Sequence, residues 1–456
     1  MRQLLGFLQQ ISVMNFIWSM GSRFGSTVLS FLVLYAASHS LPTAEYGLYI
    51  FLFSVGSSLG LIFVFGQHVL LVKHYRLDGH ARGETNQGIL LANASWLAFG
   101  SAVLVLAASV TWAYADRLET PYNSLPIAFL FAAIFALSEY FQNYFRIHGR
   151  IALALGPREN IWRILCAMAL PALAYSGYMT SGATAAEVVT LLLGVTVTYQ
   201  FVKFLQFEGI GFIWRRDALP SRDIWRTWRT ETGFFTANSF FNSAASYFET
   251  ILIGLLLDLE AAAFYFVAFR ISMLLTLPVL AIDTVGIPLI SACFQENDRR
   301  GAQRITAFLS AGSFALALIG GLFLYFFGGF ILSQFDPNFE QHFGILLILC
   351  LGAITSAFFG PGTWLIMIGN GEKYLLVMRT IVFVVYLAAL GILGYELGLA
   401  GVAVASWLQL LAVHLFSRRW VIRRWQVDNA ATSLIAVLSD KSSKGSTRNG
   451  NVQDTP

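Results

Sequence analysis

The segment that decides the fold is NFIWSMGSRFGSTVLSFLVLY, which runs from Asn15 to Tyr35. Its length suits one crossing of a bilayer, because ~20 apolar residues that rise ~1.5 Å each span ~30 Å of hydrocarbon. Polar residues recur within it at steps of four, three, four and four, which places them on one face of a helix. These residues are Asn15, Ser19, Ser22, Ser26 and Ser30.

Arg23 lies beside this polar stripe. A charge at membrane depth costs at least ~2.5–3.5 kcal/mol on insertion scales, so the side chain is expected to face a wet or paired interior. We interpret the segment as a transmembrane helix that forms one wall of a polar cavity.

The composition of the chain also indicates a membrane protein. Of its 456 residues, 57% are hydrophobic and only 12% are charged, whereas an ordinary soluble domain has about 25% charged residues. We therefore predict an all-α integral membrane protein with twelve transmembrane helices. The expected spans are residues 13–37, 45–72, 87–114, 121–146, 158–178, 184–206, 230–257, 261–290, 304–328, 341–368, 374–395 and 399–422. The sequence Gly360-Pro361-Gly362 is expected to kink or break the tenth span.

The twelve spans are expected to form two pseudo-symmetric six-helix lobes around a central cavity. A polar stretch separates six spans from six, and both halves would then cross the membrane in the same direction, as in parallel repeats. The polar composition after Trp425 indicates disorder. The predicted divisions are an N-terminal lobe at 1–206, a cytoplasmic linker at 207–229, a C-terminal lobe at 230–425 and a disordered cytoplasmic tail at 426–456.

The lysines and arginines predict that both termini are cytoplasmic. In this topology all of them lie on the cytoplasmic side except Arg117, in an outward loop, and Arg23 and Arg270, within the membrane. Arg158 and Arg163 belong to the cytoplasmic set, which we interpret mainly as topology signals.

The seventh span repeats the polar pattern of the first, with Asn238, Asn242, Ser246 and Glu249 at steps of four, four and three. Interhelical hydrogen bonds alone would explain the serines, whereas Asn, Arg and Glu in the two stripes favour a cavity. Asn15, Ser19 and Asn242 are therefore predicted to contact the substrate.

Arg270 lies near the middle of the eighth span. It is expected either to contact substrate or to form a structural ion pair with Glu249 or Asp283. Two arginines from opposite halves, Arg23 and Arg270, are suited to hold one anion between them, because arginine binds phosphate in a bidentate manner.

Three carboxylates within the spans, Glu139, Glu249 and Asp283, are candidates for ion coupling or for counter-ions to arginine. Glu139 shares one face of the fourth span with Asn143. The sequence contains no nucleotide-binding loop, no metal-ligand cluster and no nucleophile elbow. We expect no catalytic activity, cofactor, metal or nucleic acid.

Three segments resemble those of polysaccharide and O-antigen flippases, which share a superfamily with lipid II flippases and with multidrug and toxin extruders. They are EYGLY at Glu45–Tyr49, AFYFVAFRI at Ala263–Ile271 and LGLAGVAVA at Leu397–Ala405. Their order and spacing along the chain carry the resemblance, which covers about residues 10–425.

The resemblance implies that the protein moves an undecaprenyl-diphosphate-linked oligosaccharide, a polysaccharide or O-antigen repeat unit, between leaflets of the bacterial inner membrane. Transport would run from the cytoplasmic to the periplasmic leaflet by alternating access, with Arg23 and Arg270 in the cavity binding the diphosphate. The expected partners are this lipid-linked oligosaccharide, membrane lipids, and a glycan polymerase or other assembly proteins.

The nearest alternative is a cation-coupled multidrug antiporter of the same superfamily, in which carboxylates rather than arginines would dominate the cavity. A membrane-embedded glycan polymerase would need a substantial outward loop, and the outward loops predicted here are short. A scaffold for glycan assembly that transports nothing would tolerate loss of the cavity arginines.

Overall fold

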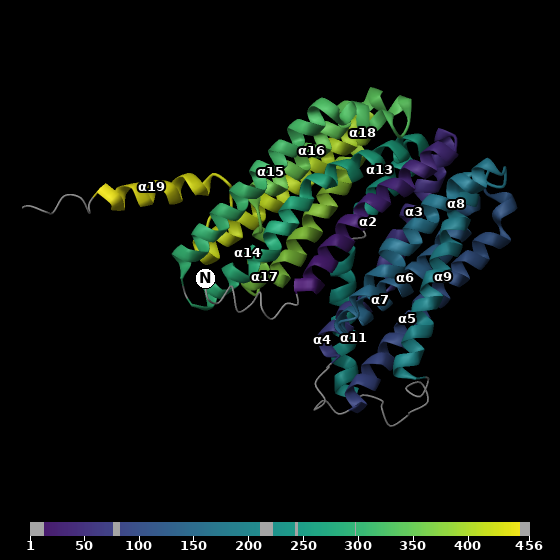
Figure 1. The fold of residues 1–456 in the computed structure, drawn as a ribbon, viewed down its shortest axis with the longest axis horizontal. Coiled ribbons are helices and arrows are strands. Elements are labelled where there is room, and N and C mark those ends of the chain that lie inside the picture. Colours follow the sequence, from purple (N-terminus) through teal and green to yellow (C-terminus); the bar gives the residue numbers. More distant parts are fainter. Residues whose placement is uncertain (1–12, 76–82, 210–221, 242–244, 297, 447–456) are drawn as a thin grey trace, which may run out of the picture. The chain divides into compact units, whose positions relative to one another are not determined.

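The computed structural model describes residues 13–75, 83–209, 222–241, 245–296 and 298–446, and nearly all of these are helical (Figure 1). No strand occurs within these ranges. The first part of the chain contains α2 (Val13–Ser40), α3 (Thr43–Phe63), α4 (Gln67–His74), α5 (Gly83–Ala113), η1 (Ala115–Arg117), η2 (Tyr122–Ser124), α6 (Leu125–Ile147), α7 (Ile151–Leu155), η3 (Gly156–Trp162), α8 (Arg163–Tyr175) and α9 (Gly182–Glu208). The second part contains α11 (Arg222–Ser239), α12 (Ala245–Leu256), α13 (Leu259–Met273), η6 (Leu274–Thr276), α14 (Leu277–Gln295), α15 (Arg299–Ser333), η7 (Pro337–His342), α16 (Phe343–Phe359), α17 (Gly362–Ile368), α18 (Glu372–Trp425) and α19 (Ser433–Ser446).

Eight helices in the described part of the chain are long and apolar enough to cross a membrane. One of them, α18, has 54 residues and would measure ~81 Å if straight, far more than a bilayer. Gly398 interrupts it with φ 58° and ψ −139°. A Cβ added at Gly401 would lie 1.9 Å from the carbonyl oxygen of Leu393, so the chain turns back on itself here. The all-α multi-pass fold is confirmed, and the total of twelve spans stays a prediction.

Other helices are interrupted within predicted spans. The break expected in the tenth span is confirmed, because α16 ends at Phe359 and α17 begins at Gly362. A 3-10 turn, η6, divides the eighth span just before Pro278. The second span is also divided, between α3 and α4, where Phe65 and Gly66 have φ of 49° and 62°. We did not predict this last break.

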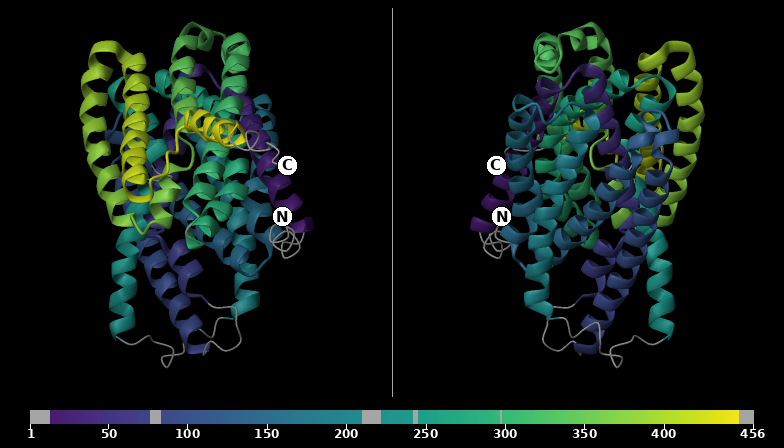
Figure 2. Two further views of the ribbon diagram at one scale, coloured as in Figure 1. Left: turned by 90° about the vertical axis from the view of Figure 1, so that its left-hand side faces the viewer. Right: turned by 90° about the vertical axis from the view of Figure 1, so that its right-hand side faces the viewer.

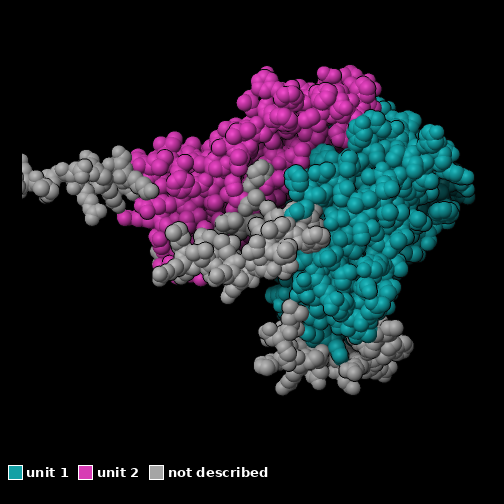
Figure 3. All heavy atoms as spheres, in the orientation of Figure 1, with its two compact units in different colours: residues 1–264 teal, residues 265–456 magenta. Residues whose placement is uncertain are grey.

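The chain forms two compact units, Met1–Phe264 and Tyr265–Pro456 (Figure 3). In the first unit, α6 packs on α3, α5 and α9, and α2 packs on α8. In the second unit, α15 packs on α14 and α16, and α16 packs on α18. The seventh predicted span joins the first unit, because α11 packs on α4 and α12 packs on α3. The pseudo-symmetric lobes at 1–206 and 230–425 therefore differ from this division by packing, and they stay a prediction.

Gly47 lies where α3 meets the start of α13. A Cβ at this position would fall 2.3 Å from the carbonyl oxygen of Leu259. The two backbones can approach this closely only if residue 47 lacks a side chain, which accounts physically for the glycine in the EYGLY segment.

Gly47→Ala should therefore destabilise the protein by about 1–3 kcal/mol, the usual cost of overpacking a tight contact. The matched control is Gly391→Ala in α18, where an added Cβ meets no atom within 4 Å. Thermal unfolding of the purified protein in detergent measures both effects. Equal midpoints for the two variants would contradict the close approach.

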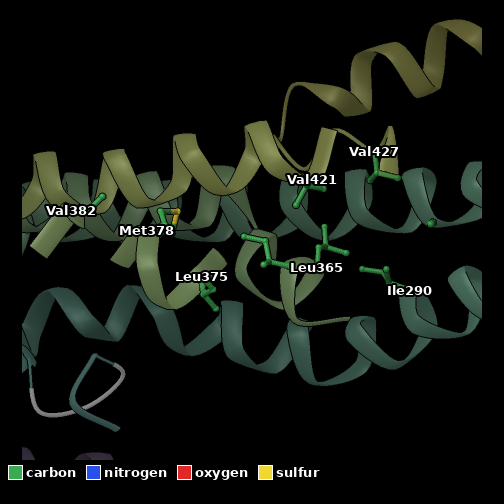
Figure 4. Packing of buried hydrophobic residues seen from close by; sticks show 9 residues of the cluster. Ile290, Leu365, Leu375, Met378, Val382, Val421 and Val427 are labelled. Carbon is green, nitrogen blue, oxygen red and sulfur yellow. The ribbon is translucent and has the colours of Figure 1, made fainter. Parts of the chain in front are cut away.

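The residues after Trp425 pack into the second unit. Val427, Asn429 and Ala430 are fully buried. Val427 joins an apolar cluster formed mainly by α14, α17 and α18, whose other members in Figure 4 include Ile290, Leu365, Leu375, Met378, Val382 and Val421. Further on, α19 contacts α15 and projects outward beyond the other helices of this unit in Figure 1, so that it lies nearest the viewer in the left view of Figure 2. The prediction of disorder is wrong for residues 426–433, and residues 447–456 lie outside the described part.

Hydrogen bonds hold this tail at the break between α16 and α17. The side-chain amide of Asn429 donates to the carbonyl oxygen of Phe359, and the Ala431 N–H donates to the carbonyl of Phe358 at 2.8 Å. Ser310 of α15 donates its hydroxyl to the carbonyl of Asn429 at 2.9 Å. The last carbonyls of a helix have no partner within that helix, so the tail satisfies the end of α16.

Asn429→Ala should cost about 1–3 kcal/mol of stability, because it leaves the carbonyl of Phe359 without this buried donor. It should also make the chain after residue 425 easier to cleave by a protease. Ser439→Ala, at an exposed position of α19, is the control and should change neither property. If a protease cleaves Asn429→Ala at the wild-type rate, the hydrogen bond of Asn429 does not hold the tail against α16.

Candidate functional site

Four charged side chains form a buried ion-pair network in the first unit. They are Glu139 of α6, Arg158 and Glu159 of η3, and Arg163 at the start of α8, with side-chain exposures of 13–19%. Arg158 Nη1 pairs with Glu139 Oε2, and Arg158 Nε lies 3.7 Å from Glu159 Oε1. Arg163 Nη1 lies 2.6 Å from Glu159 Oε2. Two carboxylates and two guanidiniums thus alternate in one connected set.

The backbone of η3 brings two of these charges together. η3 is a π-helix that contains Pro157 in its first turn. Adjacent residues on an α-helix do not face each other, whereas here Arg158 and Glu159 lie 3.7 Å apart and both contact Gln142 of α6. Short π-helical segments within helices are rare and frequently occur at functional sites.

Uncharged side chains of α6 complete the network. Gln142 donates its amide to Glu159 at 3.5 Å and accepts from Arg158 at 3.1 Å. Asn143 donates to Glu139 Oε1 at 3.3 Å. One face of α6 therefore supplies hydrogen-bond partners to three of the four charges, which is what keeps buried charges tolerable.

The network also contacts the middle of α2, the helix with the polar stripe. Arg163 Nη1 donates to the carbonyl oxygen of Ser26 at 3.0 Å, and Ser26 is only 9% exposed. Ser30 donates its hydroxyl to the same carbonyl at 2.8 Å. Because α2 has 28 residues and Ser26 lies halfway along it, the charges reach the middle of a helix long enough to span a bilayer.

The substrate residues predicted in the first span lie on this same helix. Asn15, Ser19 and Arg23 belong to α2, and Arg23 precedes Ser26 by one turn. Their side chains lie outside the described part of the structure. Asn242, from the second stripe, is outside the described residues altogether, so its predicted role stays a prediction.

The remaining predicted residues are spread over three helices. Glu249 of α12 is 9% exposed, and α12 packs on α3. The guanidinium of Arg270, on α13, lies 4.8 Å from the ring centroid of Phe266. Asp283 belongs to α14, and its side chain is outside the described part. Arg270 belongs to the second unit and Arg23 to the first, so their convergence on one anion stays a prediction.

Arg158 and Arg163, which we interpreted mainly as topology signals, are both buried in ion pairs, a role that the sequence did not indicate. The sequence left two roles possible for Glu139, ion coupling or a counter-ion to arginine. In the structure Glu139 is paired with Arg158. A sequence signal for this site does exist. The adjacent opposite charges of Arg158 and Glu159 follow Gly156-Pro157 at the start of an apolar segment.

The arrangement is balanced in charge, since each guanidinium is held by a carboxylate. A guanidinium presents a rigid fork that matches either a carboxylate or a phosphate, so an arginine paired with a carboxylate can exchange it for a phosphate. Electrostatic attraction is stronger in such a water-poor setting than in bulk water. The described residues contain no group of three or more His, Cys, Asp or Glu side chains that could hold a metal ion.

Comparison with known proteins extends these observations. A family model described as "Polysaccharide biosynthesis protein" matches residues 12–294. This range is more than half of the chain and includes the whole ion-pair network and Arg270. None of the curated proteins matches the chain in sequence.

Solved transporters share the fold. A multidrug resistance MATE family transporter of the MOP superfamily in an inward-facing conformation has a TM-score of 0.67 and 17% identity, covering 88% of this chain and 94% of that chain. An outward-facing MATE transporter has a TM-score of 0.56, 16% identity and coverages of 89% and 93%. A MOP superfamily transporter from Pyrococcus furiosus Vc1, described by the reverse polarity of its binding pocket, has a TM-score of 0.57, 16% identity and coverages of 89% and 93%. At these identities the likeness shows the fold alone.

Proposed function

The chain belongs to the polysaccharide biosynthesis protein family, and we propose that it flips an undecaprenyl-diphosphate-linked oligosaccharide from the cytoplasmic to the periplasmic leaflet. The oligosaccharide would be a repeat unit of a polysaccharide or O-antigen. The observation that carries this proposal is the family match itself, because the structurally similar MATE transporters would fit a drug carrier equally well.

The chemistry of the substrate supports an intramembrane polar path. Sugar hydroxyls cannot cross hydrocarbon without hydrogen-bond partners, so the headgroup needs a wet or polar route. The apolar chain has no such need and can stay in the bilayer. A carrier with two units that alternate access to the two sides meets both requirements.

The buried guanidiniums of the first unit support an anionic headgroup. Arg158 and Arg163 are each held by a carboxylate and lie beside the α2 helix that carries Arg23. In the proposed cycle, Arg23 and Arg270 bind the diphosphate, while the ion-pair network supplies a balanced, polar wall. Glu139 and Glu159 keep these arginines oriented when no substrate is bound.

A second candidate function is cation-coupled export of drugs, which the structural similarity to multidrug resistance MATE transporters supports. Glu249, buried on α12, is a candidate for the coupling, because carboxylates within membrane spans often bind protons or cations. Glu139 and Asp283 are the other candidates for such coupling, and a flippase driven by a cation gradient would use the same groups.

Deletion of the gene separates these functions. We expect lipid-linked oligosaccharide to accumulate in the cytoplasmic leaflet of the bacterial inner membrane, within reach of cytoplasmic but not periplasmic probes. Sensitivity to cationic dyes should not change. Unchanged distribution of the oligosaccharide together with new dye sensitivity would refute the flippase and favour the antiporter. Co-purification from wild-type cells can show whether the chain associates with a glycan polymerase or other assembly proteins, as we propose.

A further inference from the structure

Two apolar pockets lie along one side of the first unit, and both are lined by α5, α6 and α9. One has a volume of about 590 Å³ and is lined by residues that include Trp112, Ile127 and Leu191. The other has a volume of about 430 Å³ and is lined by residues that include Leu90 and Phe204. Since α5 and α9 both pack on α6, α6 forms the floor and the other two helices form the walls (helices labelled in Figure 1).

The two pockets follow each other along the same helices. On α9 the first is lined from Glu187 to Thr198 and the second from Val197 to Leu205, so Thr198 lines both. We call the combined feature the α5–α9 groove. On α9 the lining continues without a break from Glu187 to Leu205, a rise of ~27 Å along a helix. This is close to the ~30 Å thickness of the hydrocarbon core, so the groove is long enough to pass through both leaflets.

Polar atoms in the groove are largely satisfied within the protein. Thr190 and Thr198 donate their hydroxyls to the carbonyls of Ala186 and Gly194, at 2.7 and 2.8 Å. The Tyr140 hydroxyl accepts from Asn93 at 3.3 Å. What these residues present to the groove is therefore mostly carbon, which suits a hydrocarbon chain and not a polar ligand. The one charged lining residue of either pocket, Glu187, lies at the outer end.

We propose that the α5–α9 groove binds the polyprenyl chain of the lipid-linked substrate and guides it across the middle of the bilayer, an inference that rests on the proposed function. Each acyl chain of a phospholipid is confined to its own leaflet, about half of the hydrocarbon core. An undecaprenyl chain is longer than the core is thick, so one such chain can occupy a groove that is continuous through both leaflets. During flipping the chain would slide along the groove while the headgroup crosses the membrane.

The test is photo-crosslinking of the purified full-length protein in phospholipid vesicles. One probe is undecaprenyl diphosphate with a photoreactive group on its chain, and the other is phosphatidylglycerol with the same group on an acyl chain. We expect the polyprenyl probe to label peptides of α9 on both sides of Thr198, and excess unlabelled undecaprenyl diphosphate, but not excess phospholipid, to abolish the label. Equal labelling by both probes without this competition, or labelling only outside the groove, would overturn the inference.

Gly194→Leu should block the groove at its midpoint. Gly194 lines the groove beside Thr198, and an added Cβ has room, since the nearest atom is Ile134 Cδ1 at 3.7 Å. We expect about ten-fold weaker competition by undecaprenyl diphosphate, which corresponds to ~1.4 kcal/mol. The matched control is Gly391→Leu on α18, where an added Cβ meets nothing within 4 Å. If Gly194→Leu fails to fold, Ala98→Phe in the inner half provides the same test.

This inference and the proposed function can fail separately. If the wild-type protein flips lipid-linked oligosaccharide but no competed label appears in the groove, the groove inference is wrong and the flippase stands. If the competed label appears but no flipping is measured, the groove binds a polyprenyl chain in a protein with another activity.

Discussion

Arg158→Ala is expected to destabilise the protein by about 3–5 kcal/mol, the typical effect of removing one partner from a buried ion pair. The Arg158 side chain is only 13% exposed, and its guanidinium contacts Glu139, Glu159 and Gln142. Alanine in its place leaves Glu139 as a buried carboxylate that has lost its ion-pair partner. Thermal unfolding in detergent, followed by tryptophan fluorescence, would measure this loss.

A double variant separates the ion pair from the packing around it. Glu139→Gln combined with Arg158→Met replaces both charges with groups of similar size, and it should recover most of the stability lost by Arg158→Ala. The control is Arg418→Ala in the second unit. Arg418 makes a two-pronged ion pair with Asp428 at 2.9 and 2.8 Å, but both side chains are about one-third exposed. Solvent screening limits such a pair to ~1 kcal/mol or less. Equal losses for Arg158→Ala and Arg418→Ala would show that burial of the network has no energetic consequence.

Arg23→Ala and Arg270→Ala should each slow the flipping of lipid-linked oligosaccharide by about 10- to 100-fold. A hydrogen bond to a charged group is worth ~1.5–3 kcal/mol, and each ~1.4 kcal/mol corresponds to ten-fold. Lysine at either position should recover part of the rate, because it keeps the charge but loses the bidentate fork. The rate of transfer in vesicles that contain the purified variants is the measurement.

The matched control for these variants is Arg117→Ala. Arg117 lies on η1 with its guanidinium 5.8 Å from the ring centroid of Tyr114, in a loop that we predict to face outward. Its loss should leave the rate unchanged. A double variant of Arg23 and Arg270 that flips substrate at the wild-type rate would refute the role of both arginines. Dye export that survives in this double variant would support the antiporter.

The positions of the helices could be predicted from the sequence because a bilayer imposes length and hydropathy directly. The predicted spans at 374–395 and 399–422 agree with the two arms of α18, and the glycines and proline at 360–362 do end a helix. These features depend on local residue chemistry, namely apolar length, missing side chains and the missing amide hydrogen of proline.

The interior of the site depended on contacts between distant residues and could be predicted only in part. Glu139 was identified as a buried carboxylate, but its partner Arg158 comes from another helix and is presented by a π-helical turn that hydropathy does not reveal. The polar tail was misread for a similar reason. Asn429 is buried where its side-chain amide donates to the carbonyl of Phe359 at the end of α16. Composition alone does not reveal that this carbonyl lacks a partner within its own helix.

The groove between α5 and α9 could not be predicted from the sequence either. Each of its walls is an ordinary apolar helix, and nothing in the sequence of α5 alone distinguishes Leu90 from a residue that faces lipid elsewhere. The pocket arises because two helices pack on α6 at a distance that leaves space between them.

The most direct test of the account is transfer of a fluorescent undecaprenyl-diphosphate oligosaccharide between the leaflets of vesicles that contain only this protein. A membrane-impermeant quencher reports the fraction in the outer leaflet. Without protein, only the molecules that start in the outer leaflet should be quenched. With the wild-type chain, nearly all should become accessible, and with Arg23→Ala plus Arg270→Ala the accessible fraction should stay at the protein-free level. If the wild-type chain leaves the inner-leaflet substrate protected, with or without an applied ion gradient, the protein is not a flippase for this lipid.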